Sequence, residues 1–395
     1  MSSRTGGAAA APQRWSEGAP ALRVLADDLT GALDTAAQFT GALGPLPVLL
    51  EPGRWPRSAA FDSGLRDASP ELVRAKRAGL VDFLASAELA YLKIDSLLRG
   101  HTFSDIAEIF RRGGYRSCIL APAFPAQGRS TRQGVQHELD HDGVWRPVGP
   151  PLVEGLRALG IDARLVPPGA MLGGEGVMVC DADSEADLDA IADAGIRLGE
   201  GAPGRLLWCG TAGLARAIAG RAPAGFEGPL HPLLIVVGSR HPRSRAQLNA
   251  LTDINKELLI EIAEGAGADA APLSALLNGH GTAVLGFRFG DSVDLAAAMQ
   301  GIRGTLNDML KSVSRPAALL VTGGETLRAT CEALGTRKVV VWGELRAGFP
   351  AARLIGGLWD GTTVISKSGA FGDADALVNL AFARERDRPL LGESA

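Results

Sequence analysis

Short apolar runs alternate along this chain with amphipathic segments of helical length. The run at 22–26, LRVLA, ends in two carboxylates and is followed by an Ala-rich segment with helical periodicity. This alternation is typical of strands that are buried on both faces and of helices that cover them. We therefore expect an α/β fold with two domains, each a mostly parallel sheet flanked by helices, and an active site in the cleft between them.

Polar side chains follow several of the predicted strands, where strand-length runs such as YLKID and CILAPAF end. The residues concerned are Asp27, Asp28, Asp62, Arg66, Lys93, Asp95, Arg99, Gln127 and Arg129. In an open α/β sheet, ligands bind at the carboxyl ends of the strands. The pattern therefore predicts one polar pocket built from several strand ends.

The segment APAGFEGPLHP is rich in Gly and Pro, lacks periodicity and separates two α/β series. We expect one domain at 21–225 and a second at 226–395. Residues 1–20 are small and polar, without the apolar core of a secretory signal, and are expected to form a disordered tail.

Composition narrows the classes of function. With a formal charge of −4 and 21% charged residues, the chain has neither a disorder signature nor a basic field for nucleic acid. Its four cysteines form no CxxC pair, which favours reduced thiols in a cytoplasmic protein. No apolar run approaches the roughly 18 residues that a membrane helix needs. A soluble enzyme without nucleic-acid or membrane partners is expected, and a homodimer is the ordinary prior for it.

The stretch from His137 to His141 is a literal HExxH, the zinc motif of metalloprotease helices. Here it is followed by Asp142-Gly143, a hairpin-turn dipeptide, and by strand-forming residues. Two histidines four residues apart on a strand lie about 13 Å apart, too far to share a metal. We therefore expect a hairpin and no metal site, with His137 as a candidate to reach into the pocket.

The residue types at the strand ends can bind a small ligand that carries a carboxylate and hydroxyl groups. A carboxylate requires a cation, for which Arg66, Lys93 and Arg99 are candidates, whereas Asp28, Asp95 and Ser96 suit hydroxyl groups. Phosphoryl transfer needs a carboxylate to accept the hydroxyl proton. Asp28 is the first candidate for this base and Asp95 the second, and the sequence does not separate them. The competing interpretation is that Lys93 and Asp95 form a structural salt bridge.

The C-terminal half contains no GxxxxGK[ST] and no protein-kinase signature. Instead, GSRHPRS, TGGET and KSGAFGD each place glycine and a hydroxyl residue just before a predicted helix, where free N–H groups attract phosphate. Lys367 is a further candidate for a phosphate contact, or else a solvated lysine at a strand end.

The motifs ADDLTGALDT, KIDSLLRG, PAFPAQGRST, GSRHP, TGGET and KSGAFGD occur in the order in which they occur in the four-carbon acid sugar kinase family, which the chain resembles from about Leu22 onward. The resemblance implies an ATP-dependent kinase of threonate, erythronate or an oxo-tetronate. It places the sugar acid on Asp28, Arg66, Lys93, Ile94, Asp95 and Ser96. It places ATP on Ser239, Thr322, Gly323, Gly324, Glu325 and Gly369.

Two residues depart from the pattern of many relatives, since Glu325 stands where they have aspartate and Ala370 where they have glycine. Glu325 retains an acid that can reach Mg²⁺ or ribose hydroxyls. The alternatives are a nicotinamide-dependent oxidoreductase and a non-catalytic sugar-acid-binding protein. The first lacks a GxGxxG fingerprint after its first strand, and the second lacks a DNA-binding motif or an export signal.

Overall fold

The computed structural model describes residues 18, 20–140, 142–200, 204–267, 269–290 and 292–382. Most of the tail expected at 1–20 lies outside the described residues. We refer to 20–225 as the N-terminal half and to 226–382 as the C-terminal half. No helix in the described part of the chain is long and apolar enough to span a membrane.

Parallel strands dominate the N-terminal half, as the alternating pattern predicts. They are β1 (Leu22–Ala26), β2 (Leu46–Leu49), β3 (Ala59–Asp62), β4 (Leu89–Lys93), β5 (Ser117–Ala121), β9 (Ala163–Val166), β10 (Gly176–Cys180) and β11 (Leu206–Gly210). The helices that flank them are α1 (Leu29–Leu43), α2 (Pro70–Ala85), α3 (Thr102–Arg112), α4 (Leu152–Ala158), α5 (Glu185–Glu200) and α6 (Ala212–Ala219). Strands β1, β4, β5, β10 and β11 are buried over their whole length, which explains their continuous apolar runs.

The C-terminal half repeats this plan. Its strands are β12 (Leu233–Val237), β13 (Leu259–Ala263), β14 (Thr282–Arg288), β15 (Ala318–Thr322), β16 (Lys338–Arg346), β17 (Phe349–Ile355) and β18 (Thr363–Lys367). Its helices are α7 (Pro242–Ile254), α8 (Ala271–His280), α9 (Leu295–Met309), α10 (Gly324–Leu334) and α11 (Ala376–Ala381). Two short 3₁₀ turns are η1 (Pro125–Gln127) and η2 (Lys256–Leu258).

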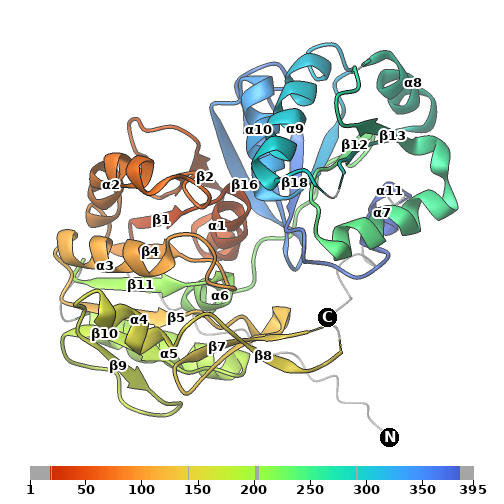
Figure 1. The fold of residues 1–395 in the computed structure, drawn as a ribbon. Helices are drawn as coiled ribbons and strands as arrows, with labels where there is room; N and C mark the ends of the chain where they lie inside the picture. Colours follow the sequence, from red (N-terminus) through yellow and green to blue (C-terminus); the bar gives the residue numbers. More distant parts are fainter. Residues whose placement is uncertain are drawn as a thin grey trace, which may run out of the picture.

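The two halves share one sheet of fifteen strands, in the order β13-β14-β12-β15-β18-β17-β16-β2-β3-β1-β4-β11-β5-β10-β9. The β16–β17 hairpin joins them, because β16 pairs antiparallel with β2 of the N-terminal half and β17 pairs antiparallel with β18. In Figure 1 β16 lies between the halves, beside α1. The mostly parallel α/β class is therefore confirmed, while the antiparallel join is an addition that the sequence pattern did not indicate.

The main hydrophobic core also crosses the join. It contains Leu33 and Phe39 of α1 together with Val339 and Val341 of β16. Few residues of helix α1 are exposed, because the helix packs both against α6 and against β16. Sheet and core thus tie the halves together at the same place.

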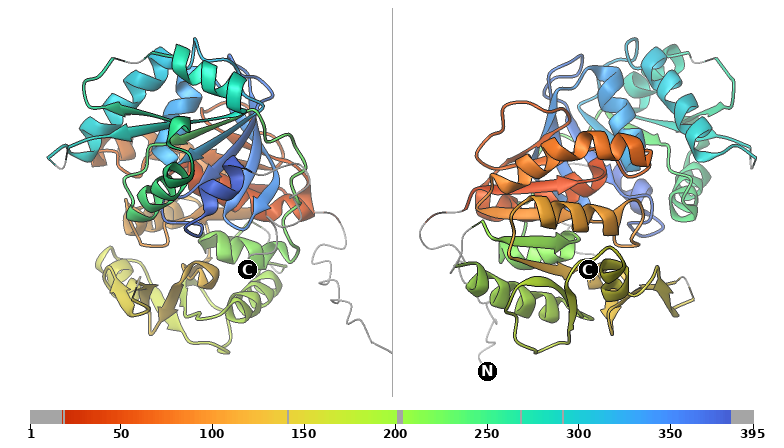
Figure 2. Two further views of the ribbon diagram at one scale, coloured as in Figure 1. Left: turned by 90° about the vertical axis from the view of Figure 1, so that its right-hand side faces the viewer. Right: turned by 60° about the vertical axis from the view of Figure 1, so that its left-hand side comes forward.

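The predicted hairpin around His137 is confirmed. Strands β6 (Arg129–Arg132), β7 (Val135–Leu139) and β8 (Trp145–Val148) form a separate antiparallel sheet, which projects from the N-terminal half in Figures 1 and 2. His141 lies outside the described residues. Elsewhere in the described chain, no cluster of three or more His, Cys, Asp or Glu side chains could hold a metal ion.

Helix α3 begins without a side-chain cap. Its N-cap is His101, which makes no side-chain capping bond, and Thr102 and Ser104 donate their hydroxyl hydrogens to the carbonyls of Arg99 and His101.

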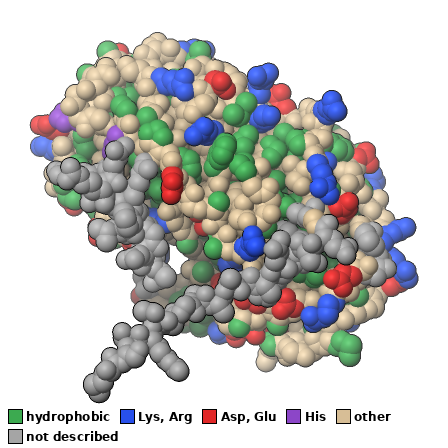
Figure 3. Space-filling view, turned by 180° about the vertical axis from the view of Figure 1, so that it is seen from behind, with side chains coloured by type: hydrophobic (Ala, Val, Ile, Leu, Met, Phe, Trp, Pro, Cys, Tyr) green, Lys and Arg blue, Asp and Glu red, His purple; other side chains and the backbone are tan. Residues whose placement is uncertain are grey.

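On the back face of the molecule, basic and acidic side chains are interspersed (Figure 3).

Because β7 is a strand, we predict that the purified protein carries no stoichiometric zinc. Elemental analysis of wild type and of the His137→Ala variant should give the same substoichiometric metal content. A tightly bound zinc that disappears in the variant would contradict the hairpin assignment.

Because sheet and core run through the β2–β16 pair, we predict that the two halves unfold together. Leu46 of β2 is 1% exposed, so Leu46→Ala should lower the free energy of unfolding of the whole chain by about 2–5 kcal/mol. The control is Leu72→Ala on α2, which is 44% exposed and should change stability by less than about 0.5 kcal/mol. Urea unfolding followed by tryptophan fluorescence reports both halves through Trp208 and Trp359. Two separate transitions, only one of them moved by Leu46→Ala, would contradict the prediction.

Candidate active site

A cavity of about 250 Å³ lies between the two halves. The N-terminal half lines it with residues that follow β1, β3, β4 and β5, and the C-terminal half lines it with the turns after β12, β15 and β18. Eleven of the predicted site residues line this cavity: Asp28, Arg66, Lys93, Asp95, Ser96, Arg99, Ser239, Gly323, Gly324, Glu325 and Gly369. Two do not: Ile94 packs into the core of the N-terminal half, and Thr322 is fully buried at the end of β15.

Asp28 occupies the turn between β1 and α1. It is the N-cap of α1, and its Oδ1 accepts a hydrogen bond from the backbone N–H of Gly31 at 3.0 Å. A Cβ on Gly31 would lie 2.5 Å from this oxygen, so glycine at this position lets the carboxylate sit on the first turn. The cap fixes the orientation of a carboxylate that is only 8% exposed.

Arg66 is surrounded by three carboxylates. Its guanidinium donates to Asp27 through Nε (3.0 Å) and one terminal nitrogen (2.6 Å), and that same nitrogen donates to Asp28 (2.8 Å). The other terminal nitrogen lies 3.5 Å from Asp95. Arg66 is therefore mainly the counter-ion of Asp27, Asp28 and Asp95, and few of its N–H groups are free to bind a ligand.

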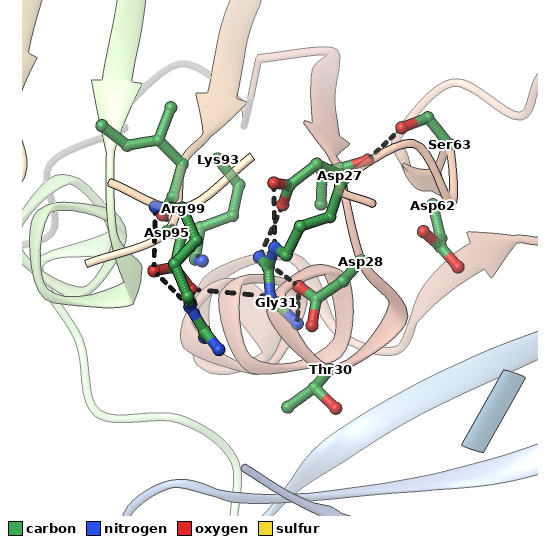
Figure 4. A network of polar contacts seen from close by, with 12 residues as sticks. Asp27, Asp28, Thr30, Gly31, Asp62, Ser63, Lys93, Asp95 and Arg99 are labelled. Carbon is green, nitrogen blue, oxygen red and sulfur yellow. Dashed lines mark hydrogen bonds and ion pairs between the residues drawn. The ribbon is translucent and has the colours of Figure 1, made fainter. Parts of the chain in front are cut away.

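The structural salt bridge between Lys93 and Asp95, which was the competing interpretation, is not formed. Asp95 accepts two hydrogen bonds from Arg99, at 3.0 and 2.7 Å, whereas Nζ of Lys93 donates to the carbonyl of Ile94 at 2.9 Å. Burial by itself would raise the pKa of Asp95, but the bonds from Arg99 and the charge of Arg66 outweigh it and hold the pKa well below its usual range. Figure 4 shows Asp28, Lys93, Asp95 and Arg99 grouped beside the start of α1.

Asp34 is a cavity residue that sequence reasoning missed. It lies on the buried side of α1, is 5% exposed, and its Oδ1 has no hydrogen-bond partner. Burial raises the pKa of Asp34 to about 6, against the nearby charge of Lys93. The sequence signal that could have identified Asp34 is an acidic residue on the otherwise apolar face of an Ala-rich helix.

Arg129 of β6 also lines the cavity, and the β6–β8 sheet explains its position. Its guanidinium donates to Glu138 at 2.7 Å and to the carbonyl of Gln127. The glutamate of the HExxH sequence thus forms an ion pair with an arginine that lines the cavity. His137 is not a lining residue of the cavity; its Nδ1 lies 2.9 Å from the carbonyl of Val135.

The three Gly-rich turns of the C-terminal half converge, as expected. A Cβ on Gly369 would lie 2.2 Å from Oγ of Ser239, and a Cβ on Gly238 would lie 2.2 Å from Oγ1 of Thr326. Gly323 has a φ of +97°, which favours glycine, and is the N-cap of α10. The first turn of an eleven-residue helix therefore opens into the cavity with no side-chain cap.

Lys367 is a structural residue of this region and does not line the cavity. It is fully buried, and its Nζ donates to the carbonyls of Ser368 and Phe371 at 2.9 Å each. Burial lowers its pKa to about 7. Lys367 thus fixes the turn that carries Gly369.

Glu325 lies in the first turn of α10 and lines the cavity. One of its carboxylate oxygens accepts a hydrogen bond from Arg303 of α9 at 3.1 Å. Burial raises the pKa of Glu325, partly offset by the charge of Arg303. Ala370 also lines the cavity, next to Gly369.

The two halves meet at Asp28. A Cβ on Gly324 would lie 2.6 Å from Oδ2 of Asp28, so the backbone of α10 packs directly against this carboxylate. Oδ1 faces Gly31 and Arg66 in the N-terminal half, and Oδ2 faces the C-terminal half. A bulky residue at 324 would therefore disturb both halves.

Two family models match this chain, one in each half. Residues 22–148 match the family described as a sugar-binding N-terminal domain, and residues 234–377 match a nucleotide-binding C-terminal domain. Among solved structures, one from Salmonella typhimurium LT2 superposes with a TM-score of 0.68 at 18% identity, covering 92% of this chain and 99% of that one. One from Haemophilus influenzae gives 0.63 at 16%, covering 91% and 99%. These two support the fold.

Three curated relatives are similar over nearly their whole length. The D-threonate kinases of Bordetella bronchiseptica and Cupriavidus necator are 30% and 32% identical, covering 93% and 90% of this chain and 99% and 95% of theirs. The D-erythronate kinase of Heliobacterium modesticaldum is 27% identical, covering 89% of this chain and 94% of its own. With both halves of the cavity matched and full-length relatives at this identity, the chain belongs to the four-carbon acid sugar kinase family.

Proposed function

We propose that this protein transfers the γ-phosphoryl group of ATP to the C4 hydroxyl of a four-carbon sugar acid, such as threonate, erythronate or an oxo-tetronate. One observation carries the proposal. The Asp28 carboxylate, held by Arg66 and Gly31 in the sugar-binding half, turns its second oxygen toward the first turn of α10 in the nucleotide-binding half. An acceptor for a hydroxyl proton thus lies beside a helix N-terminus suited to phosphate.

Asp28 is the base in this scheme. As the hydroxyl oxygen bonds to the γ-phosphorus and the bond to the β,γ-bridging oxygen breaks, Oδ2 of Asp28 accepts the hydroxyl proton and ADP leaves. Asp95, the other candidate, has both oxygens bound by Arg99 and a pKa held low by that arginine and Arg66 despite burial, which weakens it as a base. In this scheme Asp95 positions the guanidinium groups of Arg99 and Arg66.

The carboxylate of the sugar acid needs a cation with free N–H groups. Arg99 fits best, because its side chain is 60% exposed and only its Nε and one terminal nitrogen are bound to Asp95. Lys93 and Arg66 add positive charge to the same wall, and Ser96 offers a hydroxyl. Ile94 contributes through its backbone, since its carbonyl accepts from Lys93.

In this proposal the nucleotide occupies the turns of Ser239, Gly323, Gly324 and Gly369. Thr322 is buried at the end of β15 and supports the turn that begins at Gly323. Glu325 fits an Mg²⁺ role because it is an oxygen donor at the phosphate end of the cavity with one oxygen not engaged by Arg303. Mg²⁺ usually keeps several waters and few protein ligands, which suits a single carboxylate here. When bound, the ion would neutralise charge on the phosphates.

The names of the full-length relatives support a tetronate substrate, and the family descriptions of the two halves support the division between sugar acid and nucleotide. An oxidoreductase is disfavoured, because a dinucleotide phosphate would have to approach Asp27 and Asp28 at the first strand end. A cytoplasmic location and a homodimer stay predictions.

The direct experiment is an ADP-release screen of the purified protein with Mg²⁺ and ATP against the isomers of threonate and erythronate and their oxo acids. We expect turnover with at least one four-carbon acid and none with the matching alcohols that lack a carboxylate. ADP release that no sugar acid stimulates would contradict the proposal.

We predict that Asp28→Asn lowers kcat by about 10² to 10⁴ while nucleotide affinity changes little. Asparagine can still cap α1 through its Oδ1, so the loss comes from the missing proton acceptor rather than from unfolding. Steady-state kinetics and calorimetric titration with a non-hydrolysable ATP analogue measure the two quantities.

Asp27→Asn is the matched control. Asp27 also binds Arg66, but it is not a lining residue of the cavity. Its amide variant should lose the same kind of charge contact with only a few-fold change in kcat. Equal losses in the two variants would show that the charge balance around Arg66, and not proton transfer, is responsible.

A further inference from the structure

Helix α10 contacts the sugar-binding half at two points one helical turn apart. Its first residue, Gly324, packs against Asp28, and four residues later Arg328 reaches Asp62 at the end of β3. Residues i and i+4 lie on one face of a helix, so the same face of α10 makes both contacts. The helix whose first turn opens into the cavity is thus attached to the half that binds the sugar acid.

The second contact is buried and specific. Asp62 is fully buried, and its carboxylate accepts from a terminal nitrogen of Arg328, whose other terminal nitrogen lies 3.4 Å from the carbonyl of Leu50. A Cβ on Gly64 would lie 2.8 Å from the guanidinium carbon of Arg328. Gly64 also has a φ of +60°, so both space and backbone favour glycine where the guanidinium lies on the loop.

The loop that Arg328 contacts carries a residue of the sugar-acid site. Asp62 also accepts from the N–H of Gly64, at 2.8 Å. The N–H groups of Leu65 and Arg66 donate to the carbonyl of Asp27, at 3.1 and 3.2 Å. Arg66 then binds the carboxylates of Asp27 and Asp28. Only three residues thus separate Asp62, which Arg328 contacts, from Arg66, the counter-ion of the proposed base. Figure 4 shows Asp62 on the same side of the site as Asp27 and Asp28.

On its other side Arg328 belongs to a charged network of the nucleotide-binding half. Its Nε lies 3.4 Å from Glu332, which pairs with Arg303, and Arg303 also pairs with Glu325 in the cavity. A continuous chain of ion pairs therefore runs from Glu325, through Arg303 and Glu332, to Arg328 and Asp62.

We propose that Arg328 is a positioning residue that couples the two ligand sites: through its contacts with Asp62 and the 62–66 loop, it links the placement of α10 on the nucleotide to the placement of Arg66 and Asp28 on the sugar acid. This rests on the proposed function. Arg328 does not line the cavity, so it touches neither ligand and acts through these neighbours.

The physical basis is the free-energy cost of a buried Asp62 carboxylate that has lost its counter-ion. Complete burial raises the pKa of Asp62 to about 7, opposed by the charge of Arg328. Without the guanidinium, a buried carboxylate takes up a proton or draws in water, and the loop loses the shape that the ion pair imposes. A nucleotide that orders α10 would then no longer order the sugar-acid site with it.

The test measures coupling instead of activity alone. Sugar-acid affinity is titrated by calorimetry with and without a saturating non-hydrolysable ATP analogue, using the tetronate that the turnover screen identifies. In wild type we expect the nucleotide to tighten the sugar acid by roughly five- to 150-fold. In Arg328→Met the factor should fall close to one, while each ligand alone binds within a few-fold of wild type. With the other substrate saturating, KM for the sugar acid and for ATP should each rise by about the coupling factor that is lost, and kcat should fall on the order of ten- to a hundredfold.

Arg328→Lys keeps the charge and should recover part of the coupling. The matched control is Arg77→Met, because Arg77 forms a comparably buried ion pair with Asp105 inside the sugar-binding half alone. It should lose stability but keep the coupling factor. If Arg328→Met is poorly folded, Asp62→Asn removes the same pair from the other side and should give the same loss of coupling.

The outcomes separate the two proposals. Failure of wild type to bind nucleotide or any sugar acid would overturn the proposed function itself. Binding of both ligands without coupling in wild type, or coupling that persists in Arg328→Met and Asp62→Asn, would overturn the role of Arg328 and leave the kinase proposal intact.

Discussion

The Asp28 carboxylate is the point on which the arrangement of the site depends. One of its oxygens is fixed by the amide of Gly31 and the guanidinium of Arg66, and the other lies against the backbone of Gly324 in the opposite half. The β2–β16 pairing brings the halves together, because it places the carboxyl ends of the two sets of parallel strands around one cavity. A buried carboxylate with both oxygens directed in this way costs little reorganisation when a proton is transferred to it.

Charge balance explains why so many acids can lie together. Asp27, Asp28 and Asp95 share Arg66, and Asp95 has Arg99 as well. An unpaired buried charge would be expensive, so removal of either arginine affects several carboxylates at once. The same physics recurs at Asp62 and Arg328, where α10 forms an ion pair with the sugar-binding half one turn after its first residue, Gly324, packs against Asp28.

Much of the fold and of the site could be predicted from the sequence, because local patterns determine them. The apolar runs located β1, β4 and β15, and the polar residues after them line the cavity as the carboxyl-end rule predicts. The β16–β17 join was not predicted, since antiparallel pairing of β16 with a strand some 290 residues away leaves no local signal. For the same reason the sequence suggested Arg66 as a free cation and left a pair of Lys93 with Asp95 as an alternative, whereas pairing in space assigns Arg66 to three carboxylates and Arg99 to Asp95.

The most direct measurement for this account is a crystal structure of the ternary complex with a non-hydrolysable ATP analogue, Mg²⁺ and the tetronate that the protein turns over. The account predicts that the C4 hydroxyl oxygen lies within about 2.6–3.2 Å of Oδ2 of Asp28, in line with the γ-phosphorus, with the phosphates on the first turn of α10. A hydroxyl bound by Asp95 instead, or a γ-phosphate placed away from Gly324, would contradict it.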